Sequence, residues 1–211
     1  MTIFHDRRHA GIVLAEFVKD TDFDVVAAIP RGGVIVAAEI AKRSQKPLLI
    51  VGVRKIPIPW NPEAGFGAIA EDCTMYLNER ILKRIDISDE QIKELSSSVK
   101  KEVERRVKVY RDKEIPDLSG KKILLVDDGF ATGYTAIAAI QLLRKKGAEK
   151  VYAAAPCSPK DTVNLLKTYA DDVFVINIQK NYPFAVASYY EDFSELNDEE
   201  VLKAISGAET A

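Results

Sequence analysis

Two adjacent carboxylates, Asp127 and Asp128, follow an apolar run at residues 123–126. Apolar residues that give way abruptly to acids predict a buried parallel strand that ends at the edge of a sheet, where α/β folds place their ligands. The two acids would therefore face an open crevice. There they could accept hydrogen bonds from hydroxyl groups, with or without a nearby cation.

The residues after the acids could hold a phosphate. Gly129 and Gly133 allow the backbone to approach a ligand closely, and Thr132 and Thr135 bring hydroxyls to the start of a predicted helix. Free N–H groups at a helix start attract anions. The candidate binding turn comprises Gly129, Phe130, Ala131, Thr132, Gly133, Tyr134 and Thr135. A phosphate beside hydroxyl-binding acids suggests a ribose 5-phosphate, whereas an ordinary acid-capped turn needs neither two carboxylates nor two threonines.

Two further segments carry positive charge to the same predicted edge. Arg31, Gly32 and Gly33 follow the first strand, so their backbone amides and the guanidinium could hold phosphate oxygens. The alternative is a strand-to-helix turn made of glycines. Arg54 and Lys55 come at the end of the second strand and add two cations.

Apolar periodicity predicts the elements that must position these groups. Strands are expected at 25–29, 48–53, 123–126, 151–155 and 173–178, and helices at 10–18, 34–43, 135–146 and 160–169. Strands that alternate with helices predict one α/β domain over residues 1–211, with a doubly wound, mainly parallel sheet of about five strands flanked by helices.

The middle of the chain interrupts this alternation. Residues 56–67 contain three prolines, Trp60 and two glycines, which predicts a loop, and 68–77 could form a short hairpin or an extended excursion. Residues 89–111 predict an amphipathic helix. Its basic residues are interspersed with Glu94, Glu102 and Glu104, which favours a solvated face or a dimer flank over nucleic-acid binding.

Composition narrows the function classes. The 211 residues are 47% apolar and 29% charged, with a formal net charge of -2, so no bulk attraction to nucleic acid is expected. Without a run long enough for a membrane span or a secretion signal, we expect a cytoplasmic protein with no membrane partner. Cys73 and Cys157 lack metal-type spacing, and His5 with His9 would make a poor metal site, which favours a solvated helix start near Asp6.

The strand, acid pair and hydroxyl-rich turn resemble the phosphoribosyl pyrophosphate (PRPP) signature of type I phosphoribosyltransferases. The resemblance implies that Asp127 and Asp128 hold ribose hydroxyls and that residues 129–135 hold the 5-phosphate. It also implies that Arg31, Arg54 and Lys55 neutralise pyrophosphate, and that Mg²⁺ takes part, with Asp127 and Asp128 as candidate ligands directly or through water. The family often has a cis peptide in the pyrophosphate loop, so we expect one at or next to Arg31–Gly32.

The whole chain is similar to a less-characterised microbial group within that family. The shared motifs are Pro-Arg-Gly-Gly at 30–33, Arg-Lys at 54–55, Trp-Asn-Pro-Glu at 60–63 and Gly-Ala-x-Ala-Glu-Asp at 67–72. The resemblance implies a flexible lid at about 55–70, with Trp60 and Phe66 as apolar cover, and a small C-terminal hood at about 179–211. Glu71 and Asp72 could reach a metal or a ribose hydroxyl, or only end a strand.

The resemblance implies a Mg²⁺-dependent enzyme that moves the phosphoribosyl group of PRPP to a small nitrogenous, nucleobase-like acceptor, and a homodimer is expected. Enzymes for 6-oxopurines carry an aspartate where this chain has Ala131, so such an acceptor is disfavoured. The aromatics of 182–193 could stack on a base or simply pack the tail. The alternative function is a regulator that senses PRPP without turning it over.

Overall fold

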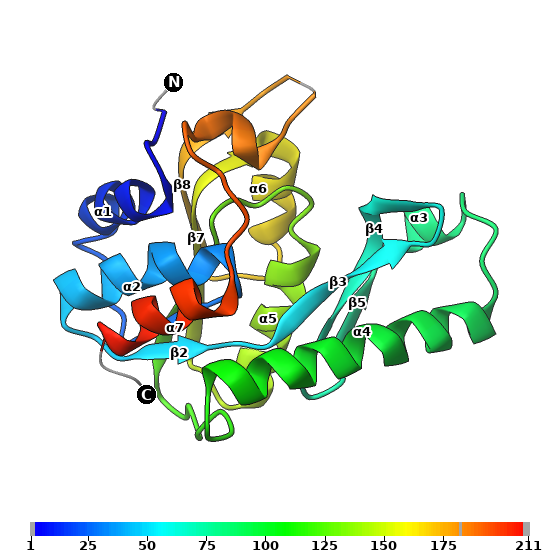
Figure 1. Cartoon of the computed structure of the whole chain (residues 1–211), viewed down its shortest axis with the longest axis horizontal. Helices are drawn as coiled ribbons and strands as arrows, with labels where there is room; N and C mark the ends of the chain where they lie inside the picture. The colour runs from blue at the N-terminus through cyan, green and yellow to red at the C-terminus, as the bar shows by residue number, and fades with distance from the viewer. Residues whose placement is uncertain (1–2, 182, 209–211) are drawn as a thin grey trace.

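A five-stranded parallel sheet forms the centre of the computed structural model, which describes residues 3–181 and 183–208 (Figure 1). The strands lie in the order β2-β1-β6-β7-β8, and every neighbouring pair is parallel. Their bounds are β1 Val25–Ala28, β2 Leu48–Ile50, β6 Lys122–Val126, β7 Lys150–Pro159 and β8 Asp172–Gln179. The predicted fold class, an α/β sheet with helices on both faces, is confirmed.

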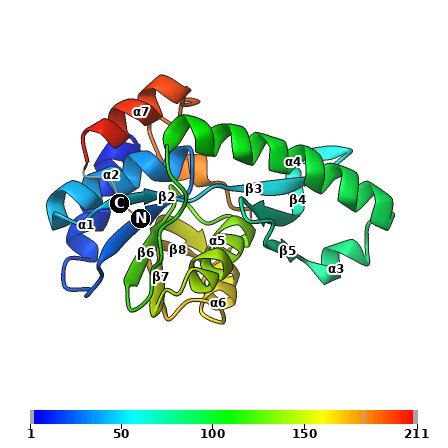
Figure 2. The same ribbon diagram turned by 90° about the horizontal axis from the view of Figure 1, so that it is seen from below.

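Side chains alternate between the two faces of this sheet, as strand geometry requires. Val25, Ala27 and Leu125 belong to a core formed with α5 (Tyr134–Lys145) and α6 (Lys160–Leu166). Val26, Ala28 and Val126 belong to a second core. That core also contains residues of α1 (Arg7–Phe17), α2 (Gly32–Ser44) and α7 (Asp198–Ser206). Figure 2 shows the two helical layers on opposite sides of the sheet.

An arm extends from the end of β2. Three antiparallel strands, β3 (Val53–Ile58), β4 (Asn61–Ala70) and β5 (Met75–Leu77), form a second sheet. A short helix α3 (Glu79–Leu82) and the long helix α4 (Asp89–Tyr110) complete it, and the arm projects well away from the central sheet (Figures 1 and 2).

Two expectations were wrong here. The predicted loop at 56–67 is instead the hairpin of β3 and β4, which turns at Pro59 and Trp60. Proline is tolerated because the strand register shifts on both sides of Pro57, and a bulge is where a strand can accept a residue without an N–H donor. The predicted strand at 48–53 is divided between β2 in the central sheet and β3 in the arm.

The predicted helix at 89–111 is confirmed as α4. Ser88 begins it with a capping box in which Gln91 is the reciprocal partner. Its apolar stripe packs on the hairpin, where Val99 and Val103 share a core with Phe66. Phe66 is fully buried there, whereas Trp60 at the tip is 61% exposed, so of these two rings it is Trp60 that is placed to cover a ligand or a partner.

The N-terminal segment pairs with the segment that follows β8. After β8, a single 3-10 turn (η1, Val186–Tyr189) is followed by a segment that crosses the front of the molecule to α7. The backbone of Phe4 pairs with Tyr190 in a parallel bridge, and Phe4 is fully buried in a small aromatic core. Among the described helices, none has the length and apolarity needed to cross a membrane.

Candidate active site at the ends of β1 and β6

The acid pair and the glycine loop meet at one edge of the sheet. Because Ala28 at the end of β1 is in register with Val126 at the end of β6, the segments that follow them lie side by side. A Cβ on Gly32 would lie 1.8 Å from Asp128 Oδ2, and a Cβ on Gly33 would lie 2.9 Å from the Cα of Asp127. Residues 32 and 33 must therefore be glycine for the two segments to pack.

The backbone of the glycine loop has an unusual feature at its start. The peptide bond between Pro30 and Arg31 is cis, although Arg31 is not a proline. It is the bond next to Arg31–Gly32, so the expected cis peptide is present, one position before the bond that was named.

Two helix N-termini open at this edge. Helix α2 begins at Gly32 with Arg31 as its N-cap, and α5 begins at Tyr134 with Gly133 as its N-cap at a φ of 77°. Neither N-cap residue supplies a side-chain hydrogen bond to its helix. The first backbone N–H groups of both helices are therefore suited to an anion.

The turn between the acids and α5 is anchored from one side. The Phe130 N–H donates to the Cys157 carbonyl at 3.0 Å, and the Thr162 hydroxyl donates to the Ala131 carbonyl at 2.7 Å. Phe130 is buried, while Ala131 and Thr132 are exposed. The fixed side of the turn thus faces β7 and α6, and its other side presents Thr132 to solvent.

Tyr134 and Thr135, the first two residues of α5, differ in how far their side chains are buried. The Tyr134 ring is buried, and its hydroxyl accepts a hydrogen bond from Asn78 Nδ2 at 2.7 Å. Its side chain therefore connects α5 to the arm, so it is the Tyr134 backbone that is placed to bind a ligand at the helix start. Thr135 is half-buried in the first turn of α5.

The two acids are not equivalent. Asp128 Oδ2 accepts a hydrogen bond from Arg7 Nε at 2.7 Å, and both side chains are largely buried. The Asp128 carbonyl also accepts a 2.6 Å hydrogen bond from the Tyr190 hydroxyl. Asp128 is thus held at its side chain by the first helix and at its backbone by the C-terminal tail.

Asp127 is the acid of the pair that has no cationic hydrogen-bond partner among the described residues. Its Oδ1 accepts from the Asp128 backbone N–H at 2.9 Å. Burial of the carboxylate, and next the negative charge of Asp128, raise the pKa of Asp127 well above its usual range. A carboxyl of this kind keeps its proton to a higher pH than a solvated one.

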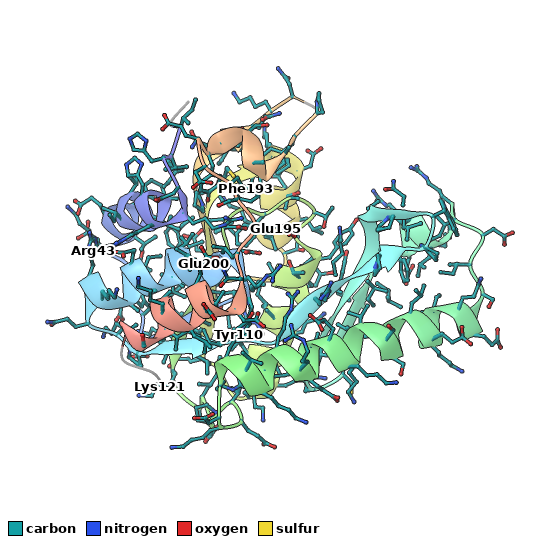
Figure 3. The ribbon with its side chains drawn as sticks, viewed as in Figure 1. Arg43, Tyr110, Lys121, Phe193, Glu195 and Glu200 are labelled. Atoms are coloured by element: carbon teal, nitrogen blue, oxygen red, sulfur yellow. The ribbon has the colours of Figure 1, made fainter. Side chains whose placement is uncertain are left out.

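Arg31 extends from the glycine loop toward the tail. Its Nη2 lies 4.0 Å from Glu195 Oε1, and Glu195 is almost fully exposed. Figure 3 shows Glu195 on the segment that crosses in front of the sheet. The contact is too long and too exposed to hold Arg31 strongly, so the guanidinium can move to an anion.

Arg54 and Lys55 are separated by the alternation of β3. Arg54 Nη1 lies 3.1 Å from Glu102 Oε1 on α4, so its side chain is on the face covered by that helix. Burial, the nearby charge of Arg106 and that of Arg31 lower the pKa of Arg54, and Glu102 partly opposes them. Lys55 must face the other side, where a Cβ added to Gly65 would lie 2.4 Å from the Lys55 Cγ.

Glu71 and Asp72 were predicted either to reach a metal or a ribose hydroxyl or only to end a strand. In the structure both make contacts with neighbouring protein groups. Glu71 pairs with Arg111, and its Oε1 accepts from the Gly52 N–H at 3.1 Å. Asp72 accepts from the Thr74 N–H at 2.8 Å and lies 3.5 Å from Lys145 Nζ. These contacts favour the interpretation that the two acids end a strand.

The aromatics of the predicted hood mostly pack inward. Tyr189 and Tyr190 are buried with Phe4 and Cys157, which favours the packing interpretation for these two rings. Tyr182 and residues 209–211 of the hood lie outside the described residues, and so does the side chain of Glu63 in the expected lid.

Comparison with known proteins identifies the family of this chain. The family model for the phosphoribosyl transferase domain matches residues 7–193. The chain belongs to the phosphoribosyltransferase family. The resemblance inferred from the sequence motifs is therefore confirmed.

Two relatives cover nearly the whole chain. A "putative phosphoribosyl transferase", Rv0571c of Mycobacterium tuberculosis, is 37% identical over 211 residues, which are 99% of this chain and 47% of that protein. The chain thus spans about half the length of that relative. The crystal structure of TT1426 from Thermus thermophilus is 33% identical with a TM-score of 0.79, and the alignment covers 99% of this chain and 100% of the other.

A short segment of the chain is also similar in sequence to ribose-phosphate pyrophosphokinases. The ribose-phosphate pyrophosphokinase of Pyrococcus furiosus is 56% identical over 39 residues, 18% of this chain and 14% of that protein. The match is a local one and concerns a segment rather than the fold of the phosphoribosyltransferase domain.

Asp127 and Asp128 alone do not provide enough ligands to enclose a metal ion. Over residues 3–181 and 183–208, no three His, Cys, Asp or Glu side chains are grouped so as to hold a metal ion. Mg²⁺ is often bound by one or two carboxylates together with substrate phosphates and water. Asp127 and Asp128 fit that kind of site, in which the substrate supplies much of the coordination.

Two cavities of the phosphoribosyltransferase domain lie away from the acid pair. One, of about 640 Å³, lies between β2, the end of α4 and α7, and includes Tyr110 in its lining. The other, of about 590 Å³, lies between α1 and α2. Neither has the acids, helix N-termini and hydroxyls that the edge of β1 and β6 combines, so size alone does not identify the site.

Sequence reasoning missed the contacts that Arg7, Tyr190 and Arg106 make beside the predicted residues. Arg7 had a weak signal, because it stands in the first turn of α1 directly after the N-cap Asp6, where a cation opposes the helix dipole. Its partner Asp128 is 121 positions away. Arg106 is one of several cations on α4, and the sequence does not single it out.

Proposed function

We propose that this phosphoribosyltransferase domain transfers the 5-phosphoribosyl group of PRPP to a small nitrogenous acceptor and releases pyrophosphate. The observation that carries the proposal is the placement of Asp127 and Asp128 between the N-termini of α2 and α5. The N–H groups at each helix start suit a phosphate, and the two acids suit the hydroxyls of a sugar that lies between the phosphates.

The reaction breaks the bond between the sugar C1 and a pyrophosphate oxygen, forms a bond from C1 to an acceptor nitrogen, and releases the proton that this nitrogen carried. Positive charge develops on the ring and negative charge on the leaving group, as in glycoside cleavage. Asp127 and Asp128 would hold the ribose hydroxyls and lie near the developing positive charge. The α5 start, with Thr132 and Thr135, would hold the 5-phosphate.

Stabilisation of the leaving pyrophosphate would come from the other side of the site. The first amides of α2 and the Arg31 guanidinium lie at that edge, with Arg54 within electrostatic reach of Arg31. Lys55 would join them from the opposite face of β3. When bound, Mg²⁺ would neutralise charge on the pyrophosphate oxygens, with Asp127 or Asp128 as its protein ligands, directly or through water.

The residue at position 131, in the turn after the acid pair, limits which acceptors we propose, whereas the C-terminal tail does not. Ala131 is exposed at the position where enzymes for 6-oxopurines have an aspartate, so it offers no carboxylate to an acceptor. We therefore propose a nucleobase-like acceptor other than a 6-oxopurine. We further propose that the domain forms a homodimer through the arm, because Trp60 and Met75 expose 61% and 44% of their surface there.

The test is to incubate the protein with PRPP and Mg²⁺ against a panel of nucleobases and amines and to measure released pyrophosphate. We expect release with at least one acceptor, and its loss when EDTA removes the metal. PRPP binding without pyrophosphate release across the panel would favour the sensor instead. Absence of PRPP binding would contradict both functions.

A further inference from the structure

We propose that Arg7 is a positioning residue for PRPP binding: it fixes the Asp128 carboxylate at the sheet edge, and the C-terminal tail fixes Arg7. This inference rests on the proposed function and assigns a role to a residue outside the loops that would touch the substrate. The argument begins with how tightly Asp128 is enclosed.

Asp128 is enclosed on two sides by groups that leave it little freedom. Gly32 lies so close that any side chain there would overlap the carboxylate. Arg7 Nε lies 2.7 Å from Asp128 Oδ2, and the Asp128 side chain is only 16% exposed. A hydrogen bond between an ionised donor and an ionised acceptor is directional as well as strong, so it sets the plane of the carboxylate.

Arg7 is in turn held by the tail through two different contacts. Its Nη1 donates to the Ser194 carbonyl at 2.9 Å, and its Cζ lies 3.8 Å from the centroid of the Phe193 ring. Figure 3 shows Phe193 on the segment that leads from η1 to α7. Nε and Nη1 thus serve different partners, a division of donors that a lysine ammonium at this position could not reproduce.

The tail is placed for this task by its pairing with the N-terminal segment. The Phe4 N–H donates to the Tyr189 carbonyl at 2.8 Å, and the Glu191 and Asp192 N–H groups donate to the carbonyls of Phe4 and His5. Tyr190 in the same segment donates its hydroxyl to the Asp128 carbonyl. The N-terminal segment and the tail therefore converge on one acid of the pair.

The consequence for binding follows from the geometry. Without Arg7 the Asp128 carboxylate would lose its fixed orientation, and a hydroxyl ligand would have to order it again. Binding geometry at a site of this kind must be held by supporting contacts to be effective. Misalignment of one hydrogen bond to a charged group corresponds to a loss of roughly 10- to 100-fold in affinity.

The experiment compares Arg7→Lys with Arg8→Lys by titration calorimetry of PRPP with Mg²⁺. Arg8 is a matched control, because it is the next residue on the same helix and its Nε pairs with Glu39 at 2.9 Å instead of with the acid pair. Calorimetry separates the dissociation constant from the fraction of protein that can bind. A purely structural role would lower only that fraction or the melting temperature.

We expect Arg7→Lys to raise the PRPP dissociation constant at least about tenfold, and Arg8→Lys to leave it within about twofold. Phe193→Leu should give a smaller rise in the same direction, because it loosens Arg7 without changing it. An unchanged dissociation constant in the folded fraction of Arg7→Lys would overturn the proposal. Wild-type protein that binds no PRPP would instead contradict the proposed function, before any variant is compared.

A second measurement uses chemical rescue. Arg7 and Ser194 line a cavity of about 210 Å³, through which a free guanidinium ion could reach the position vacated in Arg7→Ala. We expect guanidinium at non-denaturing concentration to restore PRPP binding to Arg7→Ala, whereas equal concentrations of ammonium should not. If guanidinium and ammonium restored PRPP binding equally, the separate roles assigned to Nε and Nη1 of Arg7 would be overturned.

Discussion

At the scale of single residues, the site depends on the absence of side chains as much as on their presence. Gly32 and Gly33 allow the start of α2 to touch the acid pair, since a Cβ at either position would overlap an atom of Asp128 or Asp127. The loop after the acids instead contributes a hydroxyl, which Thr132 presents at the surface. Two predictions belong to this scale.

Gly32→Ala should destabilise the fold and weaken PRPP binding together. The added methyl would lie 1.8 Å from Asp128 Oδ2, and overpacking of this kind costs about 1 to 3 kcal/mol. Thermal unfolding and PRPP titration would measure the two effects. Gly207→Ala is the control, because its Cβ would meet mainly the flexible end of Lys42 and should have little effect. Wild-type PRPP affinity in Gly32→Ala would contradict the role of this contact.

Thr132→Val should weaken PRPP binding without affecting stability. Removal of a hydroxyl that donates to a phosphate costs about 1.5 to 3 kcal/mol, while the exposed side chain contributes little to packing. Thr132→Ser keeps the hydroxyl and should bind PRPP nearly as well as the wild type. If valine and serine variants bind equally, the hydroxyl has no part in phosphate recognition.

At the scale of elements, the Glu102 carboxylate joins α4 to the hairpin of the arm. Glu102 accepts hydrogen bonds from Arg105 and Arg106 at 2.9 Å each and pairs with Arg54 of β3 at 3.1 Å. Hydrogen bonds from Arg105 and Arg106, against the opposing effect of burial, lower the pKa of Glu102 to about 2. Arg105 and Tyr110 also contact Asp198, so the same helix holds the start of α7 (Figure 3 labels Tyr110).

This network gives the free energy of unfolding a definite pH dependence. A carboxyl with a pKa near 2 when folded and near 4.5 when unfolded contributes stability above pH 4.5 and loses it as the pH falls toward 2. Glu102→Gln should therefore lower stability by about 1 kcal/mol at pH 7, after allowance for solvent screening, and by less near pH 3. Denaturant titrations at both pH values measure this.

The control for that prediction is Glu104→Gln on the same helix. Within the described part of the chain, Glu104 has a single ion pair, to Lys100 at 3.5 Å, so its removal should change stability little. A stability difference between wild type and Glu102→Gln that stays the same from pH 7 to pH 3 would contradict the assigned cause.

At the scale of the whole molecule, the arm stands apart from the sheet that carries the site (Figures 1 and 2). Its inner face is closed by Ile56, Phe66 and Val103, whereas its tip exposes Trp60. An exposed tryptophan on a projecting hairpin is better explained by a partner surface than by folding, because tryptophan is usually buried to a large extent.

Sedimentation velocity tests the proposed dimer. We expect the wild type to sediment with about twice the monomer mass of 23.4 kDa, and Trp60→Ser to shift toward the monomer. Ser97→Ala, on the exposed face of α4, is the control and should sediment like the wild type. A wild-type protein that sediments as a monomer at micromolar concentration would rule out the dimer.

The sequence was sufficient for the local features that follow from residue type. Apolar runs located the strands of the central sheet, and the apolar stripe of residues 89–111 located α4. The acid pair, the glycine loop and the hydroxyl turn were found because each occupies a few consecutive residues. The possible hairpin at 68–77 is present, because the end of β4 pairs with β5. Strand β3 and the start of β4 were missed, because prolines predict a break unless a bulge or turn accommodates them.

The tertiary structure decided what depends on distant residues. The separation of Arg54 from Lys55 required the face on which α4 packs, and the engagement of Asp128 required Arg7 and the tail to arrive from opposite ends of the chain. Such contacts have no local pattern, since a hydrogen bond across 121 positions forms only after the sheet and its helices have brought both ends to one edge. The sequence alone identified the groups that we propose for binding a phosphorylated sugar, and the fold decided which of them lie together.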